Sequence, residues 1–144
     1  MIEIRTPKTQ EEWDNYYQLR WEVLRKPWNQ PKGSEKDNSE DNSFHFMAID
    51  STNKVIGVCR LQKNSNIEGQ IRFMAVSENA QGKGIGKLLI NAAESKSKEL
   101  GLKTIILQAR ENAVPFYKAC HYEIQEKTFL LFDTIQHYLM TKKL

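Results

Sequence analysis

Cysteine and long apolar runs are both scarce in this sequence of 144 residues. The two cysteines are Cys59, in a strand-like apolar run, and Cys120, near the end of an expected helix, and no CxxC spacing is present. A chain of this length buries roughly 70% of its unfolded surface, so it needs no disulfide to fold. We therefore expect both cysteines to be reduced thiols, without a structural or metal-binding role, in a cytoplasmic protein.

No stretch is apolar for long enough to cross a membrane, and the first twenty residues carry charges throughout in place of the apolar core of a secretion signal. The formal net charge is +3, with acidic and basic residues mixed along the chain. An arginine-rich stripe and a cluster of stacking aromatics are also lacking. These absences argue against membrane and nucleic-acid partners, and the mild positive charge favours an anionic ligand.

The first half of the sequence predicts a strand, a helix and three further strands. Residues 2–5 read as a short strand, and the capping box of Thr9 and Glu12 begins a helix that extends to about Leu24. Polar residues with interspersed proline and glycine follow at 29–43, the one long segment expected to be flexible. Three strands joined by short turns should then form an antiparallel meander, at 44–50, 54–63 and 67–76.

The second half predicts a helix, a strand, a short helix and two strands within the same single domain, 1–144. The long helix begins at Gly84 and ends at Gly101, which supplies the left-handed stop. The run 104–109 is continuously apolar, as in strands that are buried on both faces. The remaining elements are expected at 112–120, 122–132 and 137–144.

The strand at 67–76 is apolar on one face only. Strict alternation assigns one face to Ile67, Ile71, Phe73 and Ala75, and the other face to Glu68, Gln70, Arg72, Met74 and Val76. Polar side chains in the middle of an otherwise buried strand indicate a cleft on that side.

Three glycines stand close together between this strand and the long helix, and free amides at a helix start bind phosphates. The Walker loop is excluded because Gln81 replaces its first glycine and Leu88 replaces its hydroxyl residue. The dinucleotide fingerprint fails because Lys87 or Leu89 stands where its third glycine belongs. A tight turn that needs positive φ is the remaining alternative to a ligand-binding loop.

A third spacing does fit. The hexapeptide 81–86, QGKGIG, matches Gln/Arg-x-x-Gly-x-Gly/Ala and resembles the acetyl-CoA pyrophosphate loop of the GNAT N-acyltransferase superfamily. The stretch 109–123 is similar to the second signature of that family, with His121 where the family has glycine. The blocks QIRFMAV, LRWEVLRKPWNQPKGSE and IQHYLM resemble one bacterial subgroup of mostly unassigned substrate. The resemblance implies the mixed α/β GNAT fold, in which helices flank a central, mostly antiparallel sheet that splays in its middle.

The resemblance also implies acetyl-CoA as co-substrate and no metal. In the family, a bulged strand before the loop leaves backbone groups free for the pantetheine arm, which here belong to Met74, Ala75 and Val76. The loop amides would bind the pyrophosphate, through Gln81, Gly82, Lys83, Gly84, Ile85, Gly86 and Lys87. Either lysine could equally be a solvated side chain.

Tyr117 matches the general acid of the family, which protonates the leaving thiolate of CoA. Packing within its helix is the alternative role for this side chain. Asn112 matches a family residue that bonds near the pantetheine, although a helix N-cap would look the same in the sequence.

A general base is harder to identify. Some family members carry a glutamate on the strand before the second signature, but this chain has Gln108 there, and an amide cannot accept the proton. His137, in the C-terminal IQHYLM block, is our preferred candidate because histidine titrates in the useful range. Glu68 and His45 are the other candidates.

Arg72 and Arg60 lie on neighbouring expected strands. With His45 they could form a cationic substrate pocket, which would favour an acceptor with a carboxylate. The alternative is that the arginines pair with Glu68 or Glu3.

The resemblance implies direct transfer of an acetyl group from acetyl-CoA to a primary amine of a small molecule or peptide. A CoA-binding sensor or partner-binding module without catalysis is the alternative function. The segment 29–43 either closes over the acceptor or is a solvated loop, and a homodimer is possible for this family.

Overall fold

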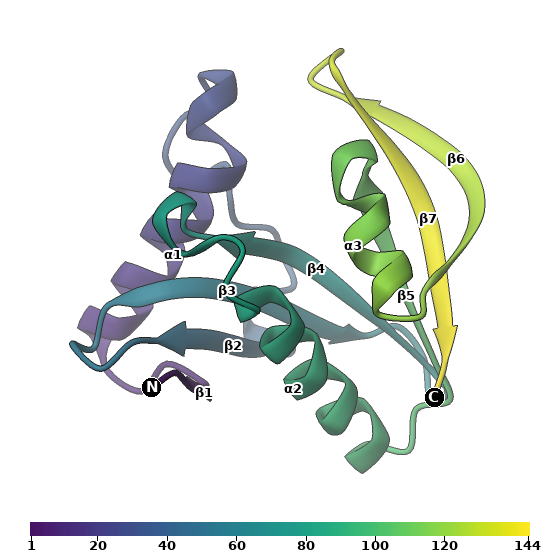
Figure 1. Ribbon diagram of the computed structural model, residues 1–144, viewed down its shortest axis with the longest axis horizontal. Coiled ribbons are helices and arrows are strands. Elements are labelled where there is room, and N and C mark those ends of the chain that lie inside the picture. The colour runs from purple at the N-terminus through teal and green to yellow at the C-terminus, as the bar shows by residue number, and fades with distance from the viewer.

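The computed structural model describes every residue from Met1 to Leu144. Its seven strands form one sheet in the order β1-β2-β3-β4-β5-β7-β6 (Figure 1). Neighbouring strands are antiparallel except β4 and β5, which are parallel. The mostly antiparallel sheet is therefore as expected. The strands are β1 (Glu3–Arg5), β2 (Phe44–Ile49), β3 (Val55–Lys63), β4 (Glu68–Val76), β5 (Thr104–Arg110), β6 (Glu123–Leu131) and β7 (Ile135–Lys143).

Helices cover both faces of the sheet. Helix α1 (Gln10–Leu24) packs on β3 and β4 and forms one apolar cluster. Helices α2 (Ile85–Glu99) and α3 (Val114–Ala119) belong to the larger cluster on the opposite face. None of the helices combines the length and apolarity needed to cross a membrane. Four short 3₁₀ helices complete the fold: η1 (Lys26–Trp28), η2 (Glu40–Asn42), η3 (Glu78–Ala80) and η4 (Glu111–Ala113).

Local sequence signals set both long helices. The Thr9 hydroxyl accepts a hydrogen bond from the Glu12 amide (3.1 Å), and the Glu12 carboxylate accepts one from the Thr9 amide (3.4 Å), so the capping box is formed. Gly101 follows α2 with a φ of +79°, the expected left-handed stop. Gly57 allows α2 to approach β3 closely, because a Cβ there would lie 2.8 Å from Ile85 Cγ2.

The segment 29–43, expected to be flexible, is anchored by ion pairs to buried arginines. Asp37 accepts hydrogen bonds from both terminal nitrogens of Arg60, at 2.6 and 3.0 Å. Glu40 accepts from Arg20 at 2.9 Å and from Arg60 at 2.8 Å. Since both arginine side chains are fully buried, the two carboxylates supply the charge that these guanidinium groups require, and the segment is tied to α1 and β3.

Strand β5 is buried on one face only, contrary to the expectation for the run 104–109. Ile105, Leu107 and Ala109 are fully buried, whereas the side chains between them remain partly exposed. The helix on the second face of the sheet, α1, packs on β3 and β4 and leaves this face of β5 open.

Candidate functional site

The sheet splays between β4 and β5. These strands pair only from Glu68 to Ile71 and from Thr104 to Leu107. Beyond this point β4 stays paired with β3, and β5 stays paired with β7. The facing edges of β4 and β5 are therefore left without a partner strand, as in the splayed sheet that the sequence resemblance implied.

A β-bulge on β4 accompanies the splay. Phe73 and Met74 together oppose Cys59 on β3, and Phe73 has a φ of +55°. The extra residue interrupts the alternation of faces: Ile71 packs in the cluster with α2, whereas Phe73 and Ala75 pack in the cluster with α1. The sequence-based assignment of these three residues to one face is thus wrong.

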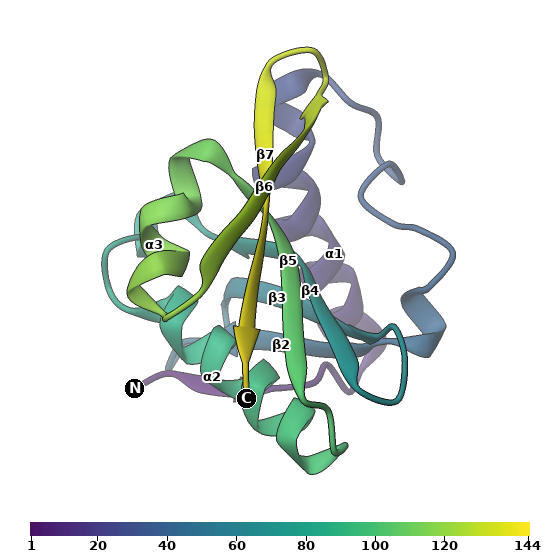
Figure 2. The same ribbon diagram turned by 90° about the vertical axis from the view of Figure 1, so that its right-hand side faces the viewer.

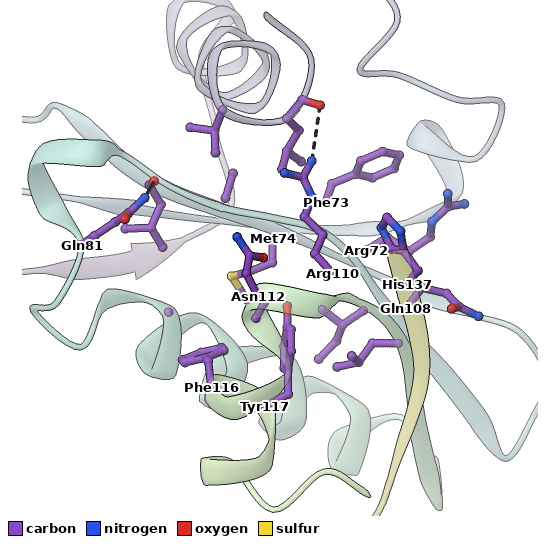
Figure 3. Close-up of a pocket in the computed structure, with 18 of the residues that line it drawn as sticks. Arg72, Phe73, Met74, Gln81, Gln108, Arg110, Asn112, Phe116, Tyr117 and His137 are labelled. Carbon is purple, nitrogen blue, oxygen red and sulfur yellow. Dashed lines mark hydrogen bonds between the residues drawn. The ribbon is translucent and has the colours of Figure 1, made fainter. Parts of the chain in front are cut away.

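A cavity of about 930 Å³ occupies the splay and extends to the glycine loop (Figure 3). Most of the predicted site residues line it: Arg72, Met74, Ala75, Val76, Gln81, Gly82, Gly84, Ile85, Gly86, Asn112, Tyr117 and His137. Five candidate residues do not line it, namely Lys83, Lys87, Arg60, His45 and Glu68.

The glycine loop presents a row of free amides to this cavity. None of the backbone N–H groups from Gly82 to Lys87 donates to another backbone group, and α2 has no side-chain cap. Gly82 and Gly84 have φ values of +79° and +80°, which glycine adopts without strain. Such a row at a helix N-terminus binds anions. The side chains of Lys83 and Lys87 are exposed to solvent.

Tyr117 contributes its hydroxyl to the middle of the cavity (Figure 3). Its ring packs edge-on against the Phe116 ring, with the two centroids 5.0 Å apart, so the side chain also packs within its helix. Burial raises the pKa of Tyr117, and no hydrogen bond contributes to that shift, so the hydroxyl is protonated at neutral pH. It can therefore act as a proton donor toward a group bound in the cavity.

Asn112 lines the cavity and is not an N-cap. The residue before α3 is Ala113, and no side chain caps that helix. In Figure 3 the amide group of Asn112 lies near the hydroxyl end of Tyr117. The turn after α3 keeps its shape without glycine, because His121 itself adopts a φ of +72°.

His137 is the one candidate base that lines the cavity. Its ring stacks on Phe129 with centroids 4.3 Å apart, and its Nδ1 donates to the Ile135 carbonyl at 3.0 Å. With that assignment Nε2 carries the free lone pair. Burial, together with the charges of Arg110 and Arg25, lowers the pKa of His137, so the ring is neutral at pH 7.

The other two candidate bases lie elsewhere. Glu68 accepts a hydrogen bond from Asn64 in the β3–β4 turn. His45 is buried beneath α1, where its Nδ1 accepts from the Tyr16 hydroxyl (2.8 Å) and its Nε2 donates to the Glu40 carbonyl (2.7 Å).

Arg60 belongs to the same buried network as His45 and does not face the cavity. Its carboxylate partners are Asp37 and Glu40, and neither Glu68 nor Glu3 pairs with it. Glu3 lies instead beside Arg5 of its own strand, with an N–O distance of 3.5 Å. Of the three residues expected to form a cationic pocket, only Arg72 lines the cavity.

Several lining residues were not identified from the sequence. Gln108 and Arg110 are two residues apart on β5, so both side chains lie on its open face. This spacing could have identified them from the sequence. Arg25 gave no signal because it follows the last residue of α1. Phe129 and Leu131 come from the β6–β7 hairpin, whose turn lies beside the end of α1 (Figure 2).

Comparison with known proteins agrees with this geometry. The profile of the Acetyltransferase (GNAT) family matches residues 13–122. The uncharacterized N-acetyltransferase YjcF of Bacillus subtilis is 29% identical over 135 residues, which cover 94% of this chain and 95% of that protein.

Solved structures show the same fold. An acyl-CoA N-acyltransferase from Pseudomonas aeruginosa superposes with a TM-score of 0.82 at 22% identity, covering 99% of this chain and 98% of that one. A GNAT family acetyltransferase from Elizabethkingia anophelis with acetyl-CoA bound has a TM-score of 0.77 at 19% identity, covering 100% and 97%. The family match over three quarters of the sequence and the shared fold lead to one conclusion: this chain belongs to the acetyltransferase (GNAT) family.

Proposed function

We propose that the protein transfers an acetyl group from acetyl-CoA directly to a primary amine. The observation that carries this proposal is one continuous cavity that joins three features: free amides at the start of α2, unpaired strand edges in the splay, and the Tyr117 hydroxyl. Together these match the phosphates, the amide-containing arm and the thioester end of acetyl-CoA in order.

The donor is held mainly by backbone groups. The pyrophosphate accepts hydrogen bonds from the amides between Gly82 and Lys87, where the partial positive charge of α2 adds attraction. The pantetheine arm lies along Met74, Ala75 and Val76, whose strand edge has no partner on the β5 side. Asn112 offers a side-chain amide to the same arm. Gly86 is packed against Phe116, with a Cβ position 2.9 Å from Phe116 Cζ, which fixes the loop against α3.

The transfer requires two proton movements. The neutral amine attacks the thioester carbonyl, a C–N bond forms, and collapse of the tetrahedral intermediate breaks the C–S bond. The Tyr117 hydroxyl donates its proton to the departing sulfur. The proton lost by the amine nitrogen passes to His137 Nε2, which is unprotonated at neutral pH. The products are the acetylated amine and CoA thiol.

A covalent acetyl-enzyme is not part of the proposal. Burial raises the pKa of Cys59 to about 12 and also raises the pKa of Cys120, so neither thiol is available as a thiolate at neutral pH. Cys59 is fully buried, and its Sγ faces the Leu89 carbonyl at 3.8 Å.

A thiol-release assay tests the proposal against a non-catalytic CoA-binding module. The protein is incubated with acetyl-CoA and a library of amines, and free CoA thiol is measured together with the affinity for CoA. We expect thiol release that depends on at least one amine and yields its N-acetyl product. Tight CoA binding without turnover across the library would favour the module instead.

A further inference from the structure

The end of the cavity away from the glycine loop carries positive charge only. Three arginines line the cavity, Arg25, Arg72 and Arg110, whereas no aspartate or glutamate does. In Figure 3, Arg72, Gln108 and His137 lie at the opposite end from Gln81 of the glycine loop, and Arg110 lies between the two ends. Arg25 lies over the same Phe73 ring as Arg72, so these two arginines are at the end away from the glycine loop, which is the acceptor side in the proposed reaction.

The charges of these arginines are incompletely paired. Arg25 and Arg110 have no carboxylate within salt-bridge distance; Arg25 donates to the carbonyls of Ser34 (3.1 Å) and Leu24 (2.9 Å), and Arg110 donates to the Leu24 carbonyl (3.4 Å). Arg72 does pair with Asp37 at 3.1 Å, but that carboxylate also accepts both hydrogen bonds from Arg60.

Aromatic rings hold the guanidinium groups in place. Arg110 lies over the Trp28 ring at 4.5 Å, Arg72 lies over Phe73 at 4.9 Å, and Arg25 lies over Phe132 at 5.5 Å. Stacked guanidinium groups lose less entropy when they bind a ligand, because they are already positioned. The site is thus preformed by α1, β4, β5 and the β6–β7 hairpin.

Like charges held together in a partly dehydrated site repel one another. Burial is the main cause that lowers the pKa of each arginine, and neighbouring arginines add to it: Arg20 and Arg72 for Arg25, Arg60 and Arg20 for Arg72, and Arg25 for Arg110. Glu35 partly offsets this shift for Arg25, and Asp37 and Glu40 partly offset it for Arg72, whereas no carboxylate offsets it for Arg110. An anion bound among them relieves this repulsion, whereas a second cation increases it.

We propose that the acceptor is an amine that bears an anionic group, and that Arg25, Arg72 and Arg110 bind this group. The inference rests on the proposed acetyl transfer and names the class of its acceptor. Carboxylate and phosphate both match the planar guanidinium through paired hydrogen bonds. The positive charge of the three arginines repels polyamines and other polycationic amines, so we expect these to be poor acceptors.

Matched amines test the proposal. The pairs differ only in the anionic group: lysine and cadaverine, phenylalanine and phenethylamine, phosphoethanolamine and ethanolamine. We expect kcat/KM to be about tenfold to hundredfold higher for the anionic member of a pair, the range for a charge-assisted hydrogen bond. A preference confined to the first two pairs identifies a carboxylate, and one confined to the third identifies a phosphate.

Arginine variants test whether these side chains cause the preference for anionic amines. Arg110→Gln and, independently, Arg25→Gln should each reduce the ratio of kcat/KM between the anionic and the neutral member of a pair by about tenfold. Thermal unfolding confirms that both variants fold. Lys54→Gln, at an exposed position of the β2–β3 turn, removes one positive charge elsewhere and should leave the ratio unchanged. Equal kcat/KM within every pair, or a ratio unaffected by both arginine variants, overturns the inference while acetyl transfer stands.

If no amine releases thiol, acetyl transfer is refuted, and the inference is decided by binding. The same pairs are then titrated calorimetrically into the CoA-saturated protein. Tighter binding of the anionic members, lost in Arg110→Gln, supports an anion site. Equal binding within each pair, or none, overturns it.

Discussion

Gly84 sits where the free amides of α2 begin, with a φ of +80° that side chains rarely adopt. We expect Gly84→Ala to destabilise the protein by about 1 kcal/mol through backbone strain and to weaken CoA binding roughly tenfold by disturbing the amides proposed to bind the pyrophosphate. Urea unfolding and CoA titration measure the two effects.

Gly33→Ala is the matched control for that substitution. Gly33 also has a positive φ, of +101°, with open space around a Cβ, but it does not line the cavity. The Gly33→Ala variant should lose a similar amount of unfolding free energy and keep the CoA affinity of the unmodified protein. Equal CoA affinity of both variants would refute the role of the loop.

Individual residues differ in how far the sequence revealed them. The glycine loop could be identified because its spacing directly specifies backbone geometry. The bulge at Phe73 could not be located by alternation, since a period of two contains no signal for an inserted residue. Gln70 and Arg72 precede the bulge and face the cavity as expected, whereas residues after it change face.

At the scale of elements, the segment 29–43 depends on Glu40. Its carboxylate accepts from Arg20 and Arg60, whose side chains are fully buried. We expect Glu40→Ala to cost about 3–5 kcal/mol of unfolding free energy, because it leaves two buried charges short of a partner. Asp41→Ala, at the neighbouring exposed position, should cost less than about 0.5 kcal/mol. Similar midpoints in urea for the two variants would contradict this assignment.

The order of the elements was predictable, whereas the contacts of this segment were not. Caps, turns and hydrophobic periods are local, so they predicted strands and helices in the observed order. The arginines that hold Asp37 and Glu40 lie 20 or more residues away in the sequence, and a polar composition alone reads as flexible. Phe129 and Leu131 of the β6–β7 hairpin line the cavity, and they were missed because the other lining residues lie far away in the sequence.

The whole molecule should lose stability in two steps as the pH falls. Burial lowers the pKa of His45 and of His137, so the unfolded chain binds more protons below about 6.5, and unfolding free energy decreases between pH 7 and pH 5. The Arg60 guanidinium lowers the pKa of Asp37 to about 2. The Asp37 carboxylate therefore contributes fully to the unfolding free energy above about pH 4, and this contribution is lost as the pH falls below that. Urea unfolding at pH 7, 5 and 3 measures both steps, and constant stability from pH 7 to pH 5 would contradict the first.

The cavity extends from Gln81 of the glycine loop to Arg72 on β4, and Tyr117 lies between them (Figure 3). Replacing it by phenylalanine removes only a hydroxyl whose pKa shift involves no hydrogen bond, so folding and packing should be preserved. The most direct measurement is therefore kcat for Tyr117→Phe with the best acceptor, together with its affinity for CoA. We expect kcat to fall roughly 10²-fold or more while the affinity for CoA stays close to that of the unmodified protein. An unchanged kcat would contradict the assignment of Tyr117 as the proton donor in acetyl transfer.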